Sequence, residues 1–309
     1  MPSEDMLVIV ETDDGPIMRT VQPASPLPQG EHRGIAAESA ARRSAAIWGL
    51  PDLIFEPLED PRGDSVREVS DGIAFLGHRA LMIQSKSRTE LSESSQRETQ
   101  WLDKNIARAI RQASGSIRTL QRSPRRMQNR RGRHVLIGKE ALQWLTVVLI
   151  DHDRIPEGYV PSMINGLDAA VLTRRDWDFL FEHLRSTSWV ADYLRRVAGE
   201  PIELGHEPAR YYELALADKT ATPAGRPGWA PDGSHSASSP RAPLRPAGEE
   251  DTNAHFMLRV IQEDIARTDI PEEQEWRRLT ALLHLDRVPL GMRTELGTRL
   301  IQYTTSTRG

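Results

Sequence analysis

The chain has 309 residues, no cysteine, and a formal net charge of −4 from 40 Lys and Arg against 44 Asp and Glu. The absence of cysteine excludes disulfides, thiolate nucleophiles and cysteine-ligated zinc sites. Residues 1–14 are acidic where a secretory signal would be basic, and no apolar run reaches the roughly 18–20 residues that cross a bilayer. We therefore expect a cytoplasmic protein with no membrane partner, built from one large domain or two smaller ones.

Strand-like and helix-like segments alternate through most of the chain. Residues 7–11 form a short β-rich run, and an alanine-rich segment at 35–48 has the apolar spacing of a helix that Gly49-Leu50-Pro51 ends. Further strands are predicted at 53–58, 66–76, 80–86, 144–150 and 171–172, and further helices at 93–113, 175–184 and 189–197. Strands interleaved with helices predict an α/β domain over residues 1–218, with a central mixed sheet flanked by helices.

The composition changes after residue 218. Pro, Gly, Ser and Ala dominate residues 219–250, which predicts a flexible linker because few large apolar side chains are there to bury. Three short helices, at 253–266, 272–285 and 292–303, then predict a small helical C-terminal module over residues 251–309. The second of these helices carries an apolar stripe that fits either packing within the module or docking of a second copy or a partner protein. The stripe consists of Trp276, Leu279, Leu282 and Leu283.

Two apolar β-rich runs flank the dipeptide Gly77-His78, a spacing typical of a β-hairpin. If the loop has two residues, counting back along the paired strands places Asp71 opposite Gln84, on the same face. Lys86 lies two residues beyond Gln84 and so points to that face too. These polar groups are costly within an apolar hairpin unless they have a function. Asp is a ligand for Mg²⁺, Gln can add a neutral oxygen, and Lys can orient a metal-bound water.

The pattern Asp-x(12)-Gln-x-Lys across a hairpin resembles the PD-(D/E)xK, or restriction-endonuclease-like, nuclease superfamily. More narrowly, it is similar to Mrr-type nucleases, in which Gln replaces the second acidic residue. The resemblance covers residues 34–150 and implies a nuclease dependent on Mg²⁺ or Mn²⁺. It implies that Asp71 binds the metal, that Gln84 takes the second ligand position and that Lys86 lies beside the attacking water. It also implies a metal-binding Glu on the first helix, for which Glu38 is the match by position. Glu68 ranks below Glu38 as a ligand, because strand alternation puts it on the opposite face from Asp71.

Every charged residue from Lys104 to Lys139 is basic. Such a run neutralises phosphates and makes binding to nucleic acid salt-dependent. Its first part extends a helix, and residues 122–133 are expected to form a mobile loop. A solvated loop or a docking surface for an acidic protein remains the alternative. The candidate nucleic-acid-binding residues, with DNA as the expected partner, are Arg88, Arg108, Arg111, Arg118, Arg122, Arg125, Arg126, Arg130, Arg131 and Arg133.

Two functions follow from these patterns. The first is a metal-dependent DNA endonuclease, with a role as a bacterial restriction or anti-phage effector that rests on analogy alone. The second is a non-catalytic nucleic-acid-binding or scaffold protein that keeps a degenerate nuclease fold and recruits partners. A weaker signal, Asp151-His152-Asp153, follows a predicted strand and is more typical of a solvated turn than of a metal site. The sequence contains neither a Gly-rich phosphate loop nor a Gly-x-Ser-x-Gly elbow, which argues against ATPases and serine hydrolases.

Overall fold

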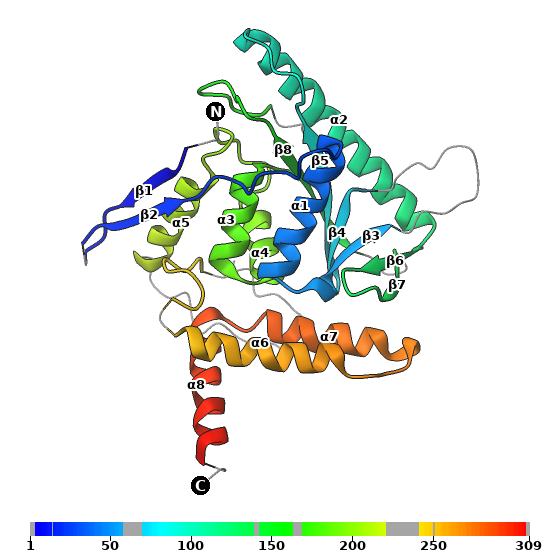
Figure 1. Cartoon of the computed structure of the whole chain (residues 1–309), viewed down its shortest axis with the longest axis vertical. Helices are drawn as coiled ribbons and strands as arrows, with labels where there is room; N and C mark the ends of the chain where they lie inside the picture. The colour runs from blue at the N-terminus through cyan, green and yellow to red at the C-terminus, as the bar shows by residue number, and fades with distance from the viewer. Residues whose placement is uncertain are drawn as a thin grey trace.

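The structure is a computed structural model that describes residues 4–13, 15–57, 70–138, 142–162, 169–220, 241–249 and 251–306. In these residues, helices cover both faces of one seven-stranded sheet, and the C-terminal helices lie across one end of it (Figure 1). This arrangement of helices and strands confirms the expected α/β class. None of the helices described is long and apolar enough to cross a membrane.

The central sheet is mixed, as expected. Its strands are β3 (Ile54–Pro57), β4 (Gly72–Leu76), β5 (Arg79–Ser87), β6 (Arg125–Asn129), β7 (His134–Ile137), β8 (Gln143–Asp151) and β9 (Ala169–Thr173). The order is β7-β6-β3-β4-β5-β8-β9, antiparallel from β7 to β5 and parallel from β5 to β9. Both faces of β5 and β8 are buried along most of their length, which explains their nearly continuous apolar runs.

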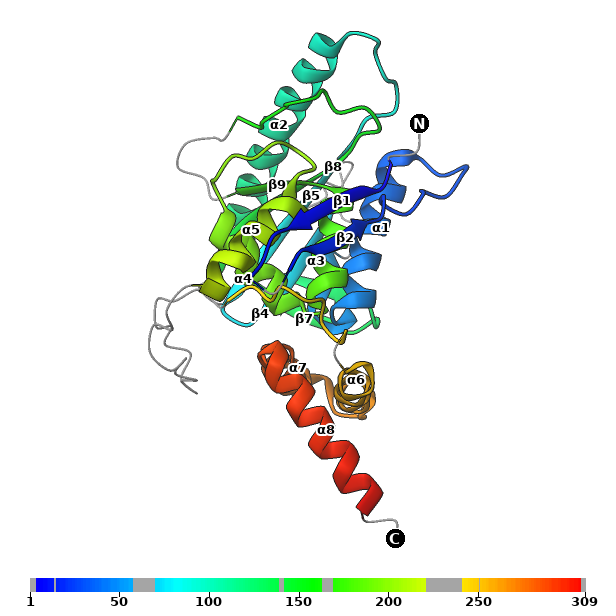
Figure 2. The same ribbon diagram turned by 90° about the vertical axis from the view of Figure 1, so that its left-hand side faces the viewer.

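Helices cover both faces of this sheet. Those that pack on it are α1 (Arg33–Trp48), α2 (Ser95–Arg122) and α3 (Arg174–Leu184). On one face α1 and α3 pack together, and Trp177 Nε1 donates a hydrogen bond to the Ala41 carbonyl at 3.0 Å. On the other face Leu102 and Ile106 of α2 pack with Val148 of β8. Figure 2 shows α1 and α2 on opposite sides of the sheet.

Several elements differ from the sequence-based predictions. The bounds differ for β1 (Met6–Val10) and α4 (Thr187–Val197), whereas β2 (Ile17–Val21), which pairs with β1, and α5 (Glu207–Thr220) were not predicted. The loop expected at 122–133 is wrong: α2 continues to Arg122, and the β6–β7 hairpin follows it at the sheet edge. The reason is that Met127 is the one buried apolar side chain of β6, so the apolar alternation that identifies a strand is missing.

The last part of the expected flexible linker, 219–250, packs against the α/β body. The carbonyl of Pro243 accepts hydrogen bonds from Tyr211 Oη at 2.8 Å and from His183 Nε2 at 3.1 Å. Ala247 N in turn donates to the carbonyl of His183 at 2.7 Å. For residues 241–249 the prediction of a flexible linker is therefore wrong. Side chains of the body donate hydrogen bonds to the backbone of this segment, and amino-acid composition cannot predict such contacts. Residues 221–240 and 250 lie outside the described residues.

Three helices follow as expected: α6 (Thr252–Arg267), α7 (Glu275–Asp286) and α8 (Leu290–Ser306). The predicted apolar stripe of α7 packs against the body of the same chain. The ring of Trp276 lies 5.5 Å from that of Phe75 in β4, and Leu279 and Leu282 belong to the main core. The stripe therefore packs against the α/β body, a position that neither packing within the module nor docking of a partner had anticipated. The far end of α8 projects from the body (Figure 1).

Two buried titratable groups of α3 should give opposite pH dependence to folding. Burial lowers the pKa of His183 to about 4 and raises that of Asp176 to about 6. As the pH falls from about 6.5 to 4, the unfolded chain protonates this histidine while the native state does not, so stability is lost. Over nearly the same window the native state protonates Asp176 first, so stability is gained.

His183→Gln should therefore gain about 3 kcal/mol of unfolding free energy relative to wild type between pH 7 and pH 4. Asp176→Asn should lose a comparable amount relative to wild type over the same interval, since both variants keep polar atoms for the local hydrogen bonds. Urea unfolding of the three proteins at several pH values measures these differences. Parallel stability–pH curves for wild type and both variants would contradict the assignment.

Candidate functional site

The hairpin of β4 and β5 has the predicted register. Leu76 pairs with Arg79 across a two-residue turn in which Gly77 has a φ of 77°, a conformation that favours glycine. The pairing continues to Gly72 opposite Ile83, so the next residue back, Asp71, lies opposite Gln84. The predicted hairpin register is therefore confirmed from Leu76–Arg79 to Gly72–Ile83, and the Asp71–Gln84 position is its continuation by one residue.

Asp71 is held where β4 begins. Its Oδ2 accepts a hydrogen bond from the backbone N–H of Ser85 at 2.5 Å, and Arg42 of α1 donates to its carbonyl oxygen. The carboxylate therefore lies against β5 at the level of Gln84, which is 4% exposed. Lys86, two residues further along β5, is half-buried. The structure thus brings the three predicted hairpin residues to one end of the β4–β5 ladder.

Gln84 and Lys86 belong to the face of the sheet that α2 covers. They pair with Val148 and Ile150 of β8, and both of these pack with α2. Two residues beyond Lys86, Arg88 continues the alternation: its Nε and Nη2 donate to Glu98 of α2 at 3.0 and 2.9 Å. Arg88, which the sequence analysis predicts to bind nucleic acid, is thus paired with an acidic side chain of the same chain.

The expected fourth member of the site lies on the other side. Glu38 is on α1, which packs against the face of the sheet opposite Gln84 and Lys86. On that face, a Cβ at Gly72 would meet the Arg42 side chain at 3.3 Å. The expectation that Glu38 faces the hairpin residues does not fit this arrangement, since helical spacing does not tell which face a helix covers. Glu68 lies outside the described residues.

The hairpin offers few donors for a metal ion. Among the residues that the structure describes, no three His, Cys, Asp or Glu side chains are grouped to hold one. Asp71 and Gln84 supply one carboxylate and one amide oxygen. Mg²⁺ keeps several waters and takes one or two protein carboxylates together with substrate phosphates. The donor set therefore fits an ion that protein and substrate share.

A second polar group lies at the carboxyl end of β8, which the sequence predicted as a solvated turn. Asp151 is 6% exposed and accepts hydrogen bonds from Arg33 Nε at 2.6 Å and Arg174 Nη1 at 3.2 Å. Arg33 also donates two hydrogen bonds to Asp153, at 2.6 and 2.7 Å, which hold the pKa of that carboxyl below its usual range. The prediction is wrong for Asp151, because arginines from two distant segments bury it.

Glu98, in the first turn of α2, contacts residues that follow β5 and β8. It accepts from Arg88 and from the backbone N–H of Ser92, and it lies 2.7 Å from His152 Nε2. The hydrogen bonds from Arg88 lower the pKa of Glu98 to about 2, whereas burial lowers that of His152. The sequence analysis missed Glu98, since an acidic residue in the first turn of a helix is commonplace.

A cavity of about 880 Å³ opens at the carboxyl ends of β8 and β9. Arg33, Asp151, Arg174 and His206 line it, so both signs of charge face its space. Ligands of open α/β sheets commonly bind outside the carboxyl ends of the strands. The cavity adjoins the hairpin site, because its lining residue Ile150 pairs directly with Lys86.

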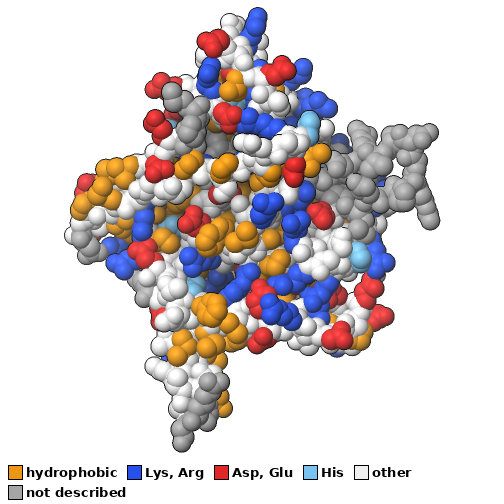
Figure 3. Space-filling model, viewed as in Figure 1, with side chains coloured by type: hydrophobic (Ala, Val, Ile, Leu, Met, Phe, Trp, Pro, Cys, Tyr) orange, Lys and Arg blue, Asp and Glu red, His pale blue; other side chains and the backbone are white. Residues whose placement is uncertain are grey.

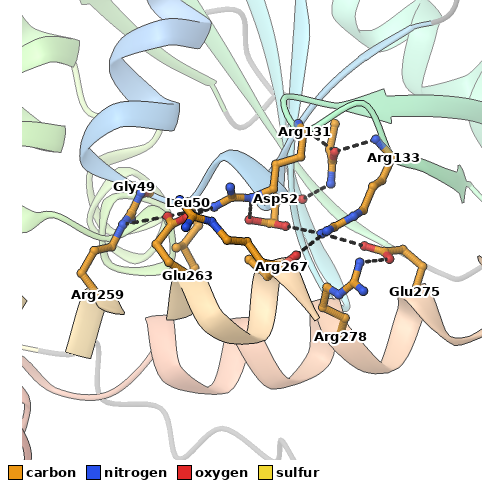
Figure 4. Close-up of polar contacts among 12 residues, drawn as sticks. Gly49, Leu50, Asp52, Arg131, Arg133, Arg259, Glu263, Arg267, Glu275 and Arg278 are labelled. Carbon is orange, nitrogen blue, oxygen red and sulfur yellow. Dashed lines mark hydrogen bonds and ion pairs between the residues drawn. The ribbon is translucent and has the colours of Figure 1, made fainter. Parts of the chain in front are cut away.

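Four arginines of the basic stretch form ion pairs with acidic residues of the same chain. Arg131 Nε donates to Asp52 Oδ2 at 2.6 Å, and its Nη2 donates to Glu263 of α6 at 2.8 Å, as Figure 4 shows. Arg133 Nη1 lies 3.2 Å from the other Asp52 oxygen. Basic and acidic side chains also alternate along the boundary between the body and the C-terminal helices (Figure 3).

Two further arginines of β6 and its turn are paired as well, Arg126 with Glu272 and Arg130 with Glu56. These four arginines therefore contact acidic residues of the C-terminal helices or the sheet edge. Binding of nucleic acid by the same side chains would compete with these ion pairs. Arg125 is exposed and has a partner too. The remaining candidates, Arg108, Arg111, Arg118 and Arg122, are exposed on α2.

Comparison with protein families, curated proteins and solved structures finds no match to this chain.

Proposed function

We propose that this protein is a metal-dependent nuclease with a restriction-endonuclease-like core that hydrolyses phosphodiester bonds in DNA. The observation that carries the proposal is the β4–β5 hairpin, in which Asp71 is bonded to the Ser85 N–H beside Gln84. In chain order the hairpin is preceded by α1 and β3 and followed by α2, the β6–β7 hairpin and β8. The helices and strands on either side of the hairpin support the proposal.

In this proposal Asp71 and Gln84 would hold Mg²⁺ or Mn²⁺. An ion held there would lower the pKa of a water and offset negative charge on a phosphate oxygen. The Ser85 N–H orients the Asp71 carboxylate by occupying one of its oxygens. Lys86, half-buried on the same face, orients the attacking water and stabilises developing negative charge. Burial of Gln84 excludes bulk water from that side of the site.

Cleavage of supercoiled plasmid and of linear DNA by the purified full chain tests the proposal. With Mg²⁺ or Mn²⁺ we expect nicking or cutting that EDTA abolishes. Lys86→Ala should cut at least about 100-fold more slowly, because it removes a cation aimed at the developing charge. Arg277→Ala, which removes an exposed cation of α7, is the matched control and should cut like wild type. Cutting by Lys86→Ala at the wild-type rate would overturn the site.

A second candidate function is a non-catalytic nucleic-acid-binding or scaffold protein with a degenerate nuclease fold. The observation in its favour is that Asp71 is the one carboxylate the described part of the hairpin site offers, with Glu38 on the other side of the sheet. In the same assay this candidate gives salt-sensitive binding without metal-dependent cleavage. A role as a restriction or anti-phage effector belongs to the first candidate and rests on analogy.

A further inference from the structure

A line of basic side chains runs along α2. Each of its members is exposed, and successive members are three, four or seven residues apart, so they return to one side of the helix. The line begins before the basic stretch recognised in the sequence, with a residue in the first turn. Its six members are Arg97, Lys104, Arg108, Arg111, Arg118 and Arg122. We call this set the α2 stripe.

The stripe points directly away from the sheet. At about 100° of rotation per residue, its six members fall within an arc of about 80°. The buried residues of α2, among them Leu102, Ile106 and Ala113, centre on the opposite side. From Arg97 to Arg122 the stripe is about 37 Å long, because each residue adds about 1.5 Å. It is therefore narrow, straight and fully presented to solvent.

The stripe is also unneutralised. Within the described ranges none of its six side chains forms an ion pair or a side-chain hydrogen bond. The arginines of the turn between β6 and β7 differ, since Arg131 and Arg133 both bind Asp52. The exposed acidic residue on α2, Asp103, accepts a hydrogen bond from Tyr159 Oη at 2.8 Å instead. Six like charges on one side of a helix repel one another, and a polyanion relieves that repulsion.

We propose that the α2 stripe binds the phosphate backbone of a single-stranded nucleic acid. The proposal deepens the proposed nuclease function and rests on it for the fate of the bound strand. A duplex strand winds through a full turn in about 34–36 Å, so a helix in its groove needs cations on both flanks. A narrow, straight line of charge instead fits one flexible strand that can extend along it.

An aromatic side chain supports the single-stranded choice. Trp101 lies on the flank of the stripe between Arg97 and Lys104 and is partly exposed. The rest of its ring packs on the core beneath α2, 5.4 Å from the His152 ring and 5.5 Å from the Arg88 guanidinium. Single-strand binding surfaces combine a basic track with aromatic rings on which bases stack. The bidentate contact of Arg88 with Glu98 ties this end of α2 to the end of β5. A strand that follows the stripe past Arg97 thus arrives at the edge of the sheet that carries Lys86.

The test is fluorescence anisotropy of a labelled oligonucleotide of about 12 nucleotides, single-stranded or annealed, titrated with full chain in EDTA. Salt is varied from about 50 to 200 mM. Arg108→Ala/Arg111→Ala should bind the single strand at least about tenfold more weakly. Its salt slope should be smaller by about 1.4, since each lost phosphate contact removes about 0.7. Arg277→Ala/Arg299→Ala removes two exposed cations of the C-terminal helices and should match wild type.

A stripe variant with the wild-type affinity and salt slope, or equal losses in both double variants, would overturn the proposal. So would tighter stripe-dependent binding of the duplex than of the single strand. Cleavage of the same labelled single strand with Mg²⁺ or Mn²⁺, beside the plasmid assay, separates this outcome from failure of the nuclease proposal. If cutting depends on Lys86 but binding does not depend on the α2 stripe, only the strand-binding proposal is wrong. If binding depends on the α2 stripe but no metal ion supports cutting, only the nuclease proposal is wrong.

Discussion

Asp52→Ala should lower the free energy of unfolding by about 3 kcal/mol, because it removes a buried carboxylate that two arginines share. Asp52, in the short 3-10 helix Pro51–Leu53, is fully buried and accepts hydrogen bonds from Arg131 and Arg133 (Figure 4). Removing the carboxylate leaves two arginines facing each other at the boundary with α6. Their remaining acidic partners, Glu263 and Glu275, lie on the C-terminal helices.

Glu272→Ala is the matched control, because it removes a carboxylate that binds Arg126 at the surface. Its side chain is 64% exposed and that of Arg126 is 54% exposed, so the pair should contribute less than about 1 kcal/mol. Denaturant unfolding of both variants beside wild type measures the difference. Asp52→Asn, which keeps an acceptor oxygen, provides an intermediate if the alanine variant does not fold. Equal losses in Asp52→Ala and Glu272→Ala would contradict a buried network that holds the C-terminal helices.

Asp71→Asn should abolish detectable binding of Mn²⁺ and reduce cleavage by about 1000-fold or more. The substitution removes the one carboxylate that the described part of the hairpin offers, and loss of a bound cation costs several kcal/mol of charge stabilisation. The fold should survive, because an Asn oxygen can still accept the hydrogen bond from the Ser85 N–H. Calorimetric titration with Mn²⁺, beside the plasmid assay, makes the measurement.

Asp269→Asn controls for general attraction of cations, since it removes an exposed carboxylate at the far end of α6. It should bind Mn²⁺ and cut as wild type does. If Asp71→Asn binds the ion as wild type does, the ligand assignment is wrong. Wild type that binds no Mn²⁺ even with DNA present would favour the non-catalytic candidate.

The hairpin was predictable because its determinants are local. Strand alternation and a two-residue turn are set by neighbours in sequence, so the pairing of Asp71 with Gln84 follows from counting. The same holds for most helices and strands, whose apolar periods are visible in short windows. Prediction failed at β6, where Arg125 and Arg126 interrupt the apolar alternation that identifies a strand.

The positions of charged groups relative to one another were not predictable. Glu38 lies on a helix with the expected bounds, yet which face of the sheet that helix covers depends on the path of the whole chain. The arginines of the basic stretch looked equivalent in sequence. Some meet acidic partners more than 100 residues away, such as Arg131 with Glu263, while those of α2 meet none among the described residues.

The α/β class, the hairpin register and the grouping of three polar residues at one end of that hairpin follow from the amino-acid sequence, because they depend on the periodicity of adjacent residues. Four features depend on how distant segments fold together: which arginines are neutralised, the burial of Asp151, the packing of residues 241–249 and the face of the sheet that the helix of Glu38 covers. Burial and ion pairing are properties of segments brought together by folding, and no local pattern of residues records which segments those are.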